Sequence, residues 1–332
     1  MALRRVLFSG NRIKIPVLIQ KTNFSTQLTR EVEEITIPVP WGHVSGKWYG
    51  PKDIRPIVGL HGWQDNAGTF DTLAPLLPQH VGFLAIDLPG HGLSSKIPNG
   101  MTYHSIDYVT FCLTLMKFYN WEKISVIAHS MSAVNTYIFT ALFPEKIDMF
   151  VGLDILKPLM MNPTKLVTAL SERLHGVMLE NERNQSNKEP PSYSFDECVE
   201  RLYKGTNKSV EKEFCKHLLE RNLAKSEKDP EKFYFRRDAR LKASMFYMFP
   251  HESILEMGKR ITAPHLFIKA RQAPFYENRK YYDDVLSYLK ANKSLFEHYD
   301  VDGTHHVHLN EAEKISKIVN PFIMKYRPKY SE

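Results

Sequence analysis

Short runs of apolar residues alternate with segments of helical length along most of this 332-residue chain. Six runs are bounded by Gly, Pro or Asp, as buried strands often are, and they lie at residues 57–60, 81–86, 124–128, 149–153, 265–269 and 295–299. Two earlier runs, 35–38 and 44–48, predict a two-stranded opening. Because strands that alternate with helices usually pair in parallel, the pattern predicts an α/β fold with a mostly parallel central sheet.

Helical spacing of apolar residues fills the gaps between the strands, most clearly at residues 103–119, 132–143 and 311–325. One gap is much longer than the others. About 110 residues separate Leu153 from His265, whereas a single crossover needs a few dozen. We therefore predict a core formed by residues 31–155 and 259–332, with residues 156–258 inserted as a helical cap, in which residues 245–249 are candidates to line a substrate pocket.

Residues 1–30 differ in charge from the rest of the chain. The formal net charge is +7, but this segment holds six of the 44 Lys and Arg residues and none of the 37 acidic residues. The remainder is nearly neutral and has no basic stripe, which argues against nucleic-acid binding. An Arg-rich, acid-free leader is typical of a mitochondrial transit peptide, so we predict a mitochondrial protein, with a cytoplasmic protein carrying a basic tail as the alternative.

The sequence also argues against a membrane-spanning protein and against a disulfide framework. No run approaches the ~18 consecutive apolar residues that a membrane span requires, so no span is predicted. The three cysteines form no CxxC pair and are predicted to be reduced thiols in the core.

The segment 124–134 reads as a strand, a tight turn and a helix, with Ser130 at the turn. A serine at such a turn projects clear of the sheet, and the backbone N–H of Met131 faces the place where an oxyanion would form. The turn requires small residues two before and two after the serine, and Ala128 and Ser132 are small although neither is glycine. The alternative is a helix that Ser132 caps at its N-terminus.

A second turn, 61–66, follows the strand 57–60 with the residues His-Gly-Trp-Gln-Asp-Asn. It exposes the backbone N–H of Trp63 toward the same point above the sheet, which makes Trp63 the second candidate oxyanion donor. The turn after the next strand contains His91, which we interpret as structural because Pro and Gly around it already explain the segment.

A nucleophilic serine needs a base, and the base needs a carboxylate that holds its tautomer. His305 follows the last predicted strand and is the favoured base, with His306 and His308 as alternatives. Asp154 directly ends a buried strand and is the favoured acid, with Glu277 as its rival. A metal site on the three histidines is the competing interpretation, but no acidic or Cys companion lies at ligand spacing, so no metal is predicted.

With these motifs in family order, the chain resembles the α/β-hydrolases, and more narrowly the serine hydrolase-like proteins. The resemblance covers most of the chain and rests on residues 61–66, 87–92, 143–146 and 303–308, the turn around Ser130, and Asp154. It implies the α/β-hydrolase fold and the chain order nucleophile, acid, base, here Ser130, Asp154 and His305. The chain departs from the family at Ala128 and Ser132, which replace the usual glycines, and in lacking an acid directly after the strand 265–269.

The function predicted from these residues is hydrolysis of a small apolar carboxylic ester through an acyl-enzyme, with no cofactor. Two alternatives remain. One is a hydrolase of carbon–carbon bonds that uses the same three side chains, and the other is a protein of this fold that binds a ligand without turnover. The sequence does not define the oligomeric state.

Overall fold

The computed structural model of the chain describes residues 30–160, 163–186, 188–244 and 248–327. The predicted leader, apart from Arg30, and residues 245–247 of the predicted pocket lining lie outside this range. No helix in the described part of the chain combines the length and the apolar character needed to cross a membrane.

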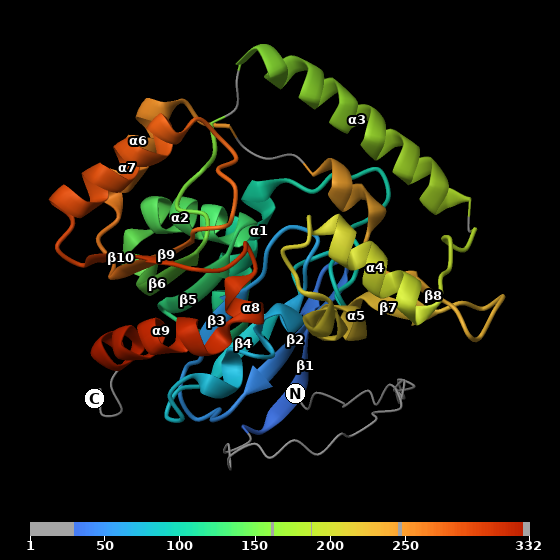
Figure 1. Cartoon of the computed structure of the whole chain (residues 1–332), viewed down its shortest axis with the longest axis horizontal. Coiled ribbons are helices and arrows are strands. Elements are labelled where there is room, and N and C mark those ends of the chain that lie inside the picture. The colour runs from blue at the N-terminus through green and yellow to red at the C-terminus, as the bar shows by residue number, and fades with distance from the viewer. Residues whose placement is uncertain (1–29, 161–162, 187, 245–247, 328–332) are drawn as a thin grey trace.

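A mostly parallel sheet runs through the centre of the molecule (Figure 1). The order of its strands across the described chain is β1-β2-β4-β3-β5-β6-β9-β10, and the pairs β1–β2 and β2–β4 are antiparallel whereas the others are parallel. The strands are β1 (Val32–Val39), β2 (Gly42–Tyr49), β3 (Ile57–Leu60), β4 (Phe83–Ile86), β5 (Ile124–His129), β6 (Ile147–Leu153), β9 (His265–Ala270) and β10 (Phe296–Val301). This topology confirms the fold class predicted from the sequence.

Successive strand residues face opposite sides of the sheet and build two hydrophobic layers. In β5, for example, Val126 and Ala128 face one layer and Ile127 faces the other. The first layer packs against α1 (Ser105–Tyr119), α2 (Met131–Leu142), α6 (His251–Arg260) and α7 (Arg279–Asn292), and the second packs mainly against α9 (Ala312–Tyr326) and the short helices η1 (Ala67–Phe70) and η2 (Ala74–Leu76). The helix α7 was not predicted from the sequence.

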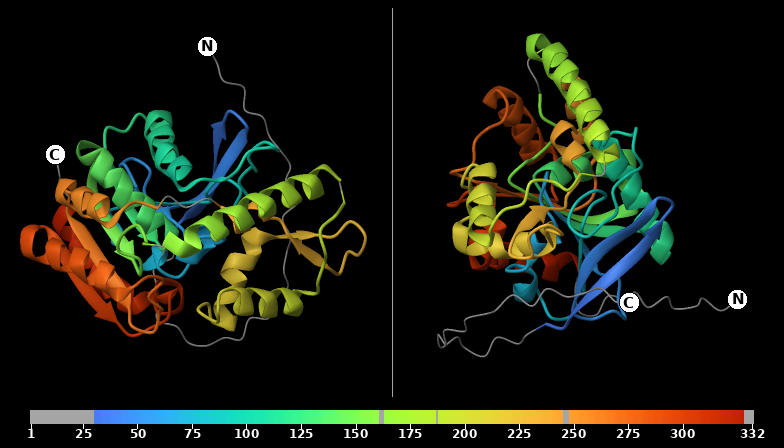
Figure 2. Two further views of the ribbon diagram at one scale, coloured as in Figure 1. Left: turned by 90° about the horizontal axis from the view of Figure 1, so that it is seen from above. Right: turned by 90° about the vertical axis from the view of Figure 1, so that its right-hand side faces the viewer.

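The interval between β6 and β9 contains more than helices. It holds α3 (Pro163–Gln185), α4 (Phe195–Gly205), η4 (Lys212–Phe214), α5 (Cys215–Asn222), β7 (Leu223–Lys225), β8 (Phe233–Phe235), η5 (Ala239–Ala243) and α6. The strands β7 and β8 form a small antiparallel sheet that was not predicted. In Figures 1 and 2, α3 runs across the outside of the molecule, away from the main sheet, while α4, α5 and the small sheet lie together at one side.

A separate hydrophobic cluster holds α4 and α5 together. It includes Cys198, Leu202, Cys215 and Leu218, and Leu309 of the short helix α8 (Val307–Asn310) joins it from the C-terminal region. Cys112, Cys198 and Cys215 are all buried free thiols. The helix α6 instead packs with α2, since the hydroxyl of Tyr137 donates to the carbonyl oxygen of Ile254 at 3.0 Å. The division into core and cap at residues 156 and 258 stays a prediction.

Candidate active site

Ser130 stands at the sharp turn between β5 and α2. Its backbone has φ 53° and ψ −116°, a sparsely populated positive-φ conformation that costs a non-glycine residue about 1–3 kcal/mol. The turn is held by the neighbouring strand, because the N–H of Ser130 donates to the carbonyl oxygen of Leu153 at 3.0 Å. The predicted strand, turn and helix are therefore present, with the serine as the residue between the two elements.

The small residues around the turn have identifiable packing roles. Ala128 and Ser132 are almost fully buried, and the hydroxyl of Ser132 donates to the carbonyl oxygen of His61. A Cβ on Gly62 would lie 2.8 Å from Nδ1 of His129 and 3.2 Å from Cβ of Ser130. The alternative reading of Ser132 as an N-cap is wrong, because α2 begins at Met131 and its N-cap is Ser130. Ser132 stands where the family has glycine, and its hydrogen bond links α2 to the turn after β3.

His305 lies in the loop after β10 and contacts two of the predicted residues. Its Nε2 is 2.9 Å from Oγ of Ser130, and its Nδ1 contacts Oδ2 of Asp154. A carboxylate only accepts, so Nδ1–H donates to Asp154 and Nε2 accepts from the Ser130 hydroxyl. The structure thus brings Ser130, His305 and Asp154 together in one line of contacts.

Asp154 is buried at the end of β6 and has three partners. Besides His305, its Oδ1 accepts from Nζ of Lys269 at 2.7 Å and from the N–H of Ala270 at 3.0 Å. Burial by itself raises the pKa of Asp154, but the hydrogen bonds and charges of His305 and Lys269 outweigh it and leave that pKa below its ordinary value. The residue is therefore an anion at neutral pH.

Glu277, the rival acid, is engaged elsewhere. Its carboxylate pairs with Nζ of the buried Lys157 at 2.6 Å and accepts from the N–H of Met160 at 2.8 Å. Of the two carboxylates, Asp154 is the one that contacts His305.

The protonation of His305 suits a base. Burial lowers its pKa, and the charge of His306 acts in the same direction, whereas the hydrogen bond to Asp154 raises it. The net pKa lies below the ordinary histidine value, so the imidazole is neutral at pH 7 and Nε2 has a free electron pair for the Ser130 proton.

Two histidines hold the turn after β3 through hydrogen bonds to the backbone. His61 donates through Nδ1 to the carbonyl oxygen of Gly62 and accepts at Nε2 from the N–H of Leu88 at 3.0 Å. His91 accepts at Nε2 from the N–H of Gln64 at 3.2 Å, which fits the structural role predicted for it. The indole N–H of Trp63 donates to the carbonyl oxygen of Leu241 at 2.6 Å and so links this turn to η5.

A cavity of about 1920 Å³ opens over these residues. Its lining includes Trp63, Ser130, Met131 and His305, so both candidate oxyanion donors border the space that the serine faces. Met248, from the predicted pocket lining, also borders it. The cavity therefore has room for a substrate of medium size next to Ser130.

The three histidines of the rival metal interpretation have separate partners. His305 is occupied by Ser130 and Asp154, while Nε2 of His308 is 2.9 Å from the hydroxyl of Thr69. His306 lies instead with Asp65 and His129, and the potential ligand atoms of these three residues lie within 4.8 Å of one another.

Three residues of the site were not predicted from the sequence. Two of them lie within predicted motifs, Asp65 in the turn 61–66 and His129 directly before Ser130. Lys269, the partner of Asp154, looked like an ordinary residue of a buried strand. A charged side chain within a buried strand is costly unless it is paired, and that was the available signal.

Comparisons with known proteins identify the family of this chain. The sequence matches the family described as alpha/beta hydrolase fold over residues 55–311. A "Probable serine hydrolase" of Drosophila melanogaster is 34% identical over 294 residues, which cover 88% of this chain and 87% of that protein. A "Serine hydrolase-like protein" of Danio rerio is 31% identical over 323 residues, covering 96% of this chain and 97% of that protein.

A solved structure is similar over nearly its whole length. It is a hypothetical protein of Pseudomonas aeruginosa, 26% identical, with a TM-score of 0.73 and coverage of 88% of this chain and 99% of its own. The fold and the names of the two relatives support a hydrolase. The chain belongs to the alpha/beta hydrolase fold family.

Proposed function

We propose that this protein hydrolyses carboxylic esters, with Ser130 as nucleophile, His305 as general base and acid, and Asp154 as the carboxylate that orients His305. The observation that carries the proposal is the position of one imidazole, which bridges Oγ of Ser130 at 2.9 Å and the buried carboxylate of Asp154. A serine hydroxyl becomes an effective nucleophile when a base within hydrogen-bond distance removes its proton, and the third group fixes the tautomer of that base.

The reaction proceeds in two halves. Oγ of Ser130 attacks the ester carbonyl carbon as Nε2 of His305 takes its proton, and the oxyanion accepts hydrogen bonds from the N–H groups of Met131 and Trp63. The imidazolium then gives that proton to the leaving alkoxide, which departs as the alcohol. Water attacks the acyl-enzyme by the same route, its proton passes through His305 to Oγ of Ser130, and the carboxylic acid leaves.

Asp154 acts on the charged states of this cycle. Its carboxylate faces Nδ1–H of His305 and stabilises the imidazolium that forms in each half. Lys269 and the N–H of Ala270 hold the other carboxylate oxygen, so Asp154 has little freedom to turn away.

The lining of the cavity supports an apolar acyl group. Met131 and Val134 follow Ser130 in α2, and Ile155 follows Asp154, so the surface beside the serine is largely apolar. Elsewhere the described lining carries nine Lys and Arg residues against four Asp and Glu residues. We therefore extend the predicted substrate, an apolar ester, to one that bears a negative charge away from the scissile bond.

Steady-state kinetics test this proposal. We expect the full chain to hydrolyse aryl esters of short and medium acyl chains, and Ser130→Ala to lower kcat by at least ~10³-fold. We also expect an ester with a carboxylate on its alcohol part to have a higher kcat/KM than its cationic analogue. His43→Gln, at an exposed histidine that contacts Leu93 and Ser95, is the matched control and should retain wild-type kinetics.

The two alternatives are distinct outcomes of the same experiment. Turnover of 2-hydroxy-6-keto acids in place of esters would identify a carbon–carbon bond hydrolase. Binding of ester analogues without any Ser130-dependent turnover would identify a ligand-binding protein of this fold.

A further inference from the structure

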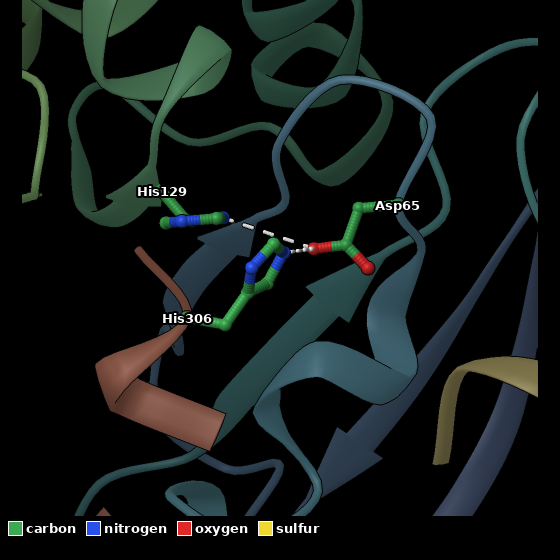
Figure 3. A group of neighbouring side chains, drawn as sticks. All are labelled: Asp65, His129 and His306. Carbon is green, nitrogen blue, oxygen red and sulfur yellow. Dashed lines mark ion pairs between the residues drawn. The ribbon is translucent and has the colours of Figure 1, made fainter. Parts of the chain in front are cut away.

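Three buried side chains beside Ser130 point toward one another (Figure 3). Asp65 comes from the turn after β3, His129 from the end of β5, and His306 from the loop before α8. Oδ2 of Asp65 is 3.7 Å from Nδ1 of His129 and 3.7 Å from Nε2 of His306. We define these residues as the Asp65 cluster. They have no role in the steps of ester hydrolysis described above.

The outward-facing nitrogens of both histidines carry their protons. Nε2 of His129 is 2.9 Å from the carbonyl oxygen of His305, which only accepts, so this nitrogen is the donor. Nδ1 of His306 is 2.8 Å from Oγ of Ser209, and that hydroxyl already donates to the carbonyl oxygen of Thr206 at 2.6 Å. Ser209 therefore accepts from His306.

It follows that each ring turns its second nitrogen toward Asp65, Nδ1 in His129 and Nε2 in His306. In a neutral imidazole with its proton on the outward nitrogen, this second nitrogen carries a lone pair. Among the described residues, Nδ1 of His129 and Oδ2 of Asp65 are buried without a hydrogen-bond partner. Such atoms are costly in a protein interior, and three electron-rich atoms directed at one point are the arrangement that a cation satisfies.

We propose that the Asp65 cluster binds a divalent transition metal ion, with Zn²⁺ as the best match, through Nδ1 of His129, Nε2 of His306 and Oδ2 of Asp65. Two imidazole nitrogens and a carboxylate oxygen form a donor set that zinc prefers. Ligands at tetrahedral zinc are ~3.4 Å apart. Each histidine nitrogen lies 3.7 Å from Oδ2 of Asp65, and the three ligand atoms all lie within 4.8 Å of one another, so the side chains would draw together around the ion.

The surroundings of the cluster match those of a metal centre. Metal-bound histidines usually donate their second N–H to a carbonyl, a carboxylate or water, which fixes the tautomer. His129 donates to the carbonyl of His305, and His306 donates to the hydroxyl of Ser209. All three ligands border the cavity that Ser130 and His305 also border, so an ion held by the cluster would lie beside the substrate space.

Occupation of the cluster would inhibit hydrolysis, a consequence that rests on the proposed function. The ring centres of His129 and His306 lie 4.6 Å and 5.2 Å from that of His305. A divalent charge held by these rings disfavours the imidazolium that His305 becomes when it takes the Ser130 proton. Metal binding at the Asp65 cluster therefore inhibits His305 as the general base.

Calorimetric titration of the chelator-treated full chain with ZnCl₂ tests the site itself. We expect one Zn²⁺ per chain in the wild type and at least ~10-fold weaker binding by His306→Gln and Asp65→Asn. The His43→Gln control should bind like the wild type. Absence of stoichiometric binding by the wild type, or equal binding by all four proteins, would overturn the proposal.

Cobalt substitution and kinetics complete the experiment. Co²⁺ bound to the wild type should give the visible absorption of a low-coordinate site, a readout that needs neither a variant nor activity, and featureless spectra would contradict the site.

Zn²⁺ should inhibit ester hydrolysis by the wild type and not by His306→Gln, while equal inhibition of both would refute the proposal that metal binding at the Asp65 cluster inhibits His305. A wild type that binds Zn²⁺ but hydrolyses no ester would refute the proposed function and leave the metal site supported.

Discussion

Two buried aspartates, Asp154 and Asp65, lie next to histidines near Ser130, and the two carboxylates differ in the groups that face them. Asp154 receives N–H groups from His305, Lys269 and Ala270, whereas Oδ2 of Asp65 faces two imidazole nitrogens at 3.7 Å. Both aspartates are buried. Among the described residues, Asp154 has a lysine as ion partner and the ion partners of Asp65 are histidines alone.

The difference lies in which ring nitrogen faces the carboxylate. His305 turns its N–H toward Asp154 because its other nitrogen meets the Ser130 hydroxyl, which has a proton to give. His129 and His306 turn their N–H groups outward to oxygens and direct their second nitrogens toward Asp65. The same residue types thus form two different arrangements. Asp154 and His305 are arranged for proton transfer, whereas the Asp65 cluster is arranged to bind a cation.

The largest expected effect comes from removing the charge of Asp154. We expect Asp154→Asn to lower kcat/KM by ~10³–10⁴-fold, because His305 loses the acceptor that fixes its tautomer and stabilises its cation. Steady-state ester hydrolysis measures the loss, with thermal unfolding to verify the fold. Glu277→Gln is the comparison variant. Should it cost more activity than Asp154→Asn, Glu277 and not Asp154 would be the acid.

A smaller effect is expected at Lys269, which acts through Asp154. Lys269→Met should lower kcat by ~10–100-fold with little change in KM, because Asp154 loses the ion pair that holds it. The positive charge of Lys269 also lowers the pKa of His305, so its removal should shift the acid limb of the pH profile to higher pH. An unchanged pH profile with lower activity would reduce Lys269 to a packing role.

The pH profile of the wild type provides a further test. Hydrolysis requires neutral His305, and burial lowers the pKa of this histidine. Activity should therefore persist below pH 6.5 and decline only as the pH falls through the lowered pKa. The profile of kcat/KM against pH measures it, and a midpoint above pH 7 would mean that the pairing with Asp154 outweighs burial.

The smallest expected effect is a change in stability when Asp65 is replaced by Asn. Oδ1 of Asp65 accepts from the N–H of Asn66 at 2.9 Å, so in Asp65→Asn the amide nitrogen would take the place of Oδ2 and donate to a histidine lone pair. We expect this variant, in the presence of chelator, to be ~1 kcal/mol more stable than the wild type. Denaturant unfolding provides the measurement. A loss of stability would mean that a proton already lies between Asp65 and a histidine.

Most of the fold, and the contacts that link Ser130 through His305 to Asp154, could be predicted from the sequence. Most of the parallel strands are short apolar runs. Asp154 directly follows β6 and His305 lies in the loop after β10, so their positions at one sheet edge follow from the topology. The strands β7 and β8 have three residues each and are too short for any periodicity to register. The helix α7 did carry a signal, since its buried residues Tyr282, Val285 and Leu289 recur at helical spacing.

The Asp65 cluster was beyond sequence reasoning for a physical reason. Asp65 and His129 are 64 positions apart and His306 is 177 positions beyond His129, so only the sheet order brings them together. Which nitrogen of each ring carries the proton depends on Ser209 and on the carbonyl of His305, neither of which has a recognisable motif.

The reactivity of Ser130 is the point on which the account of catalysis rests, and covalent labelling measures it most directly. The full chain is treated with a fluorophosphonate at neutral pH, with and without chelator, and the modified peptide is identified by mass spectrometry. We expect a single adduct on Ser130 that is abolished in Ser130→Ala and strongly slowed in Asp154→Asn. An unlabelled Ser130 in the folded, chelator-treated protein, or an adduct that persists in Ser130→Ala, would contradict the account.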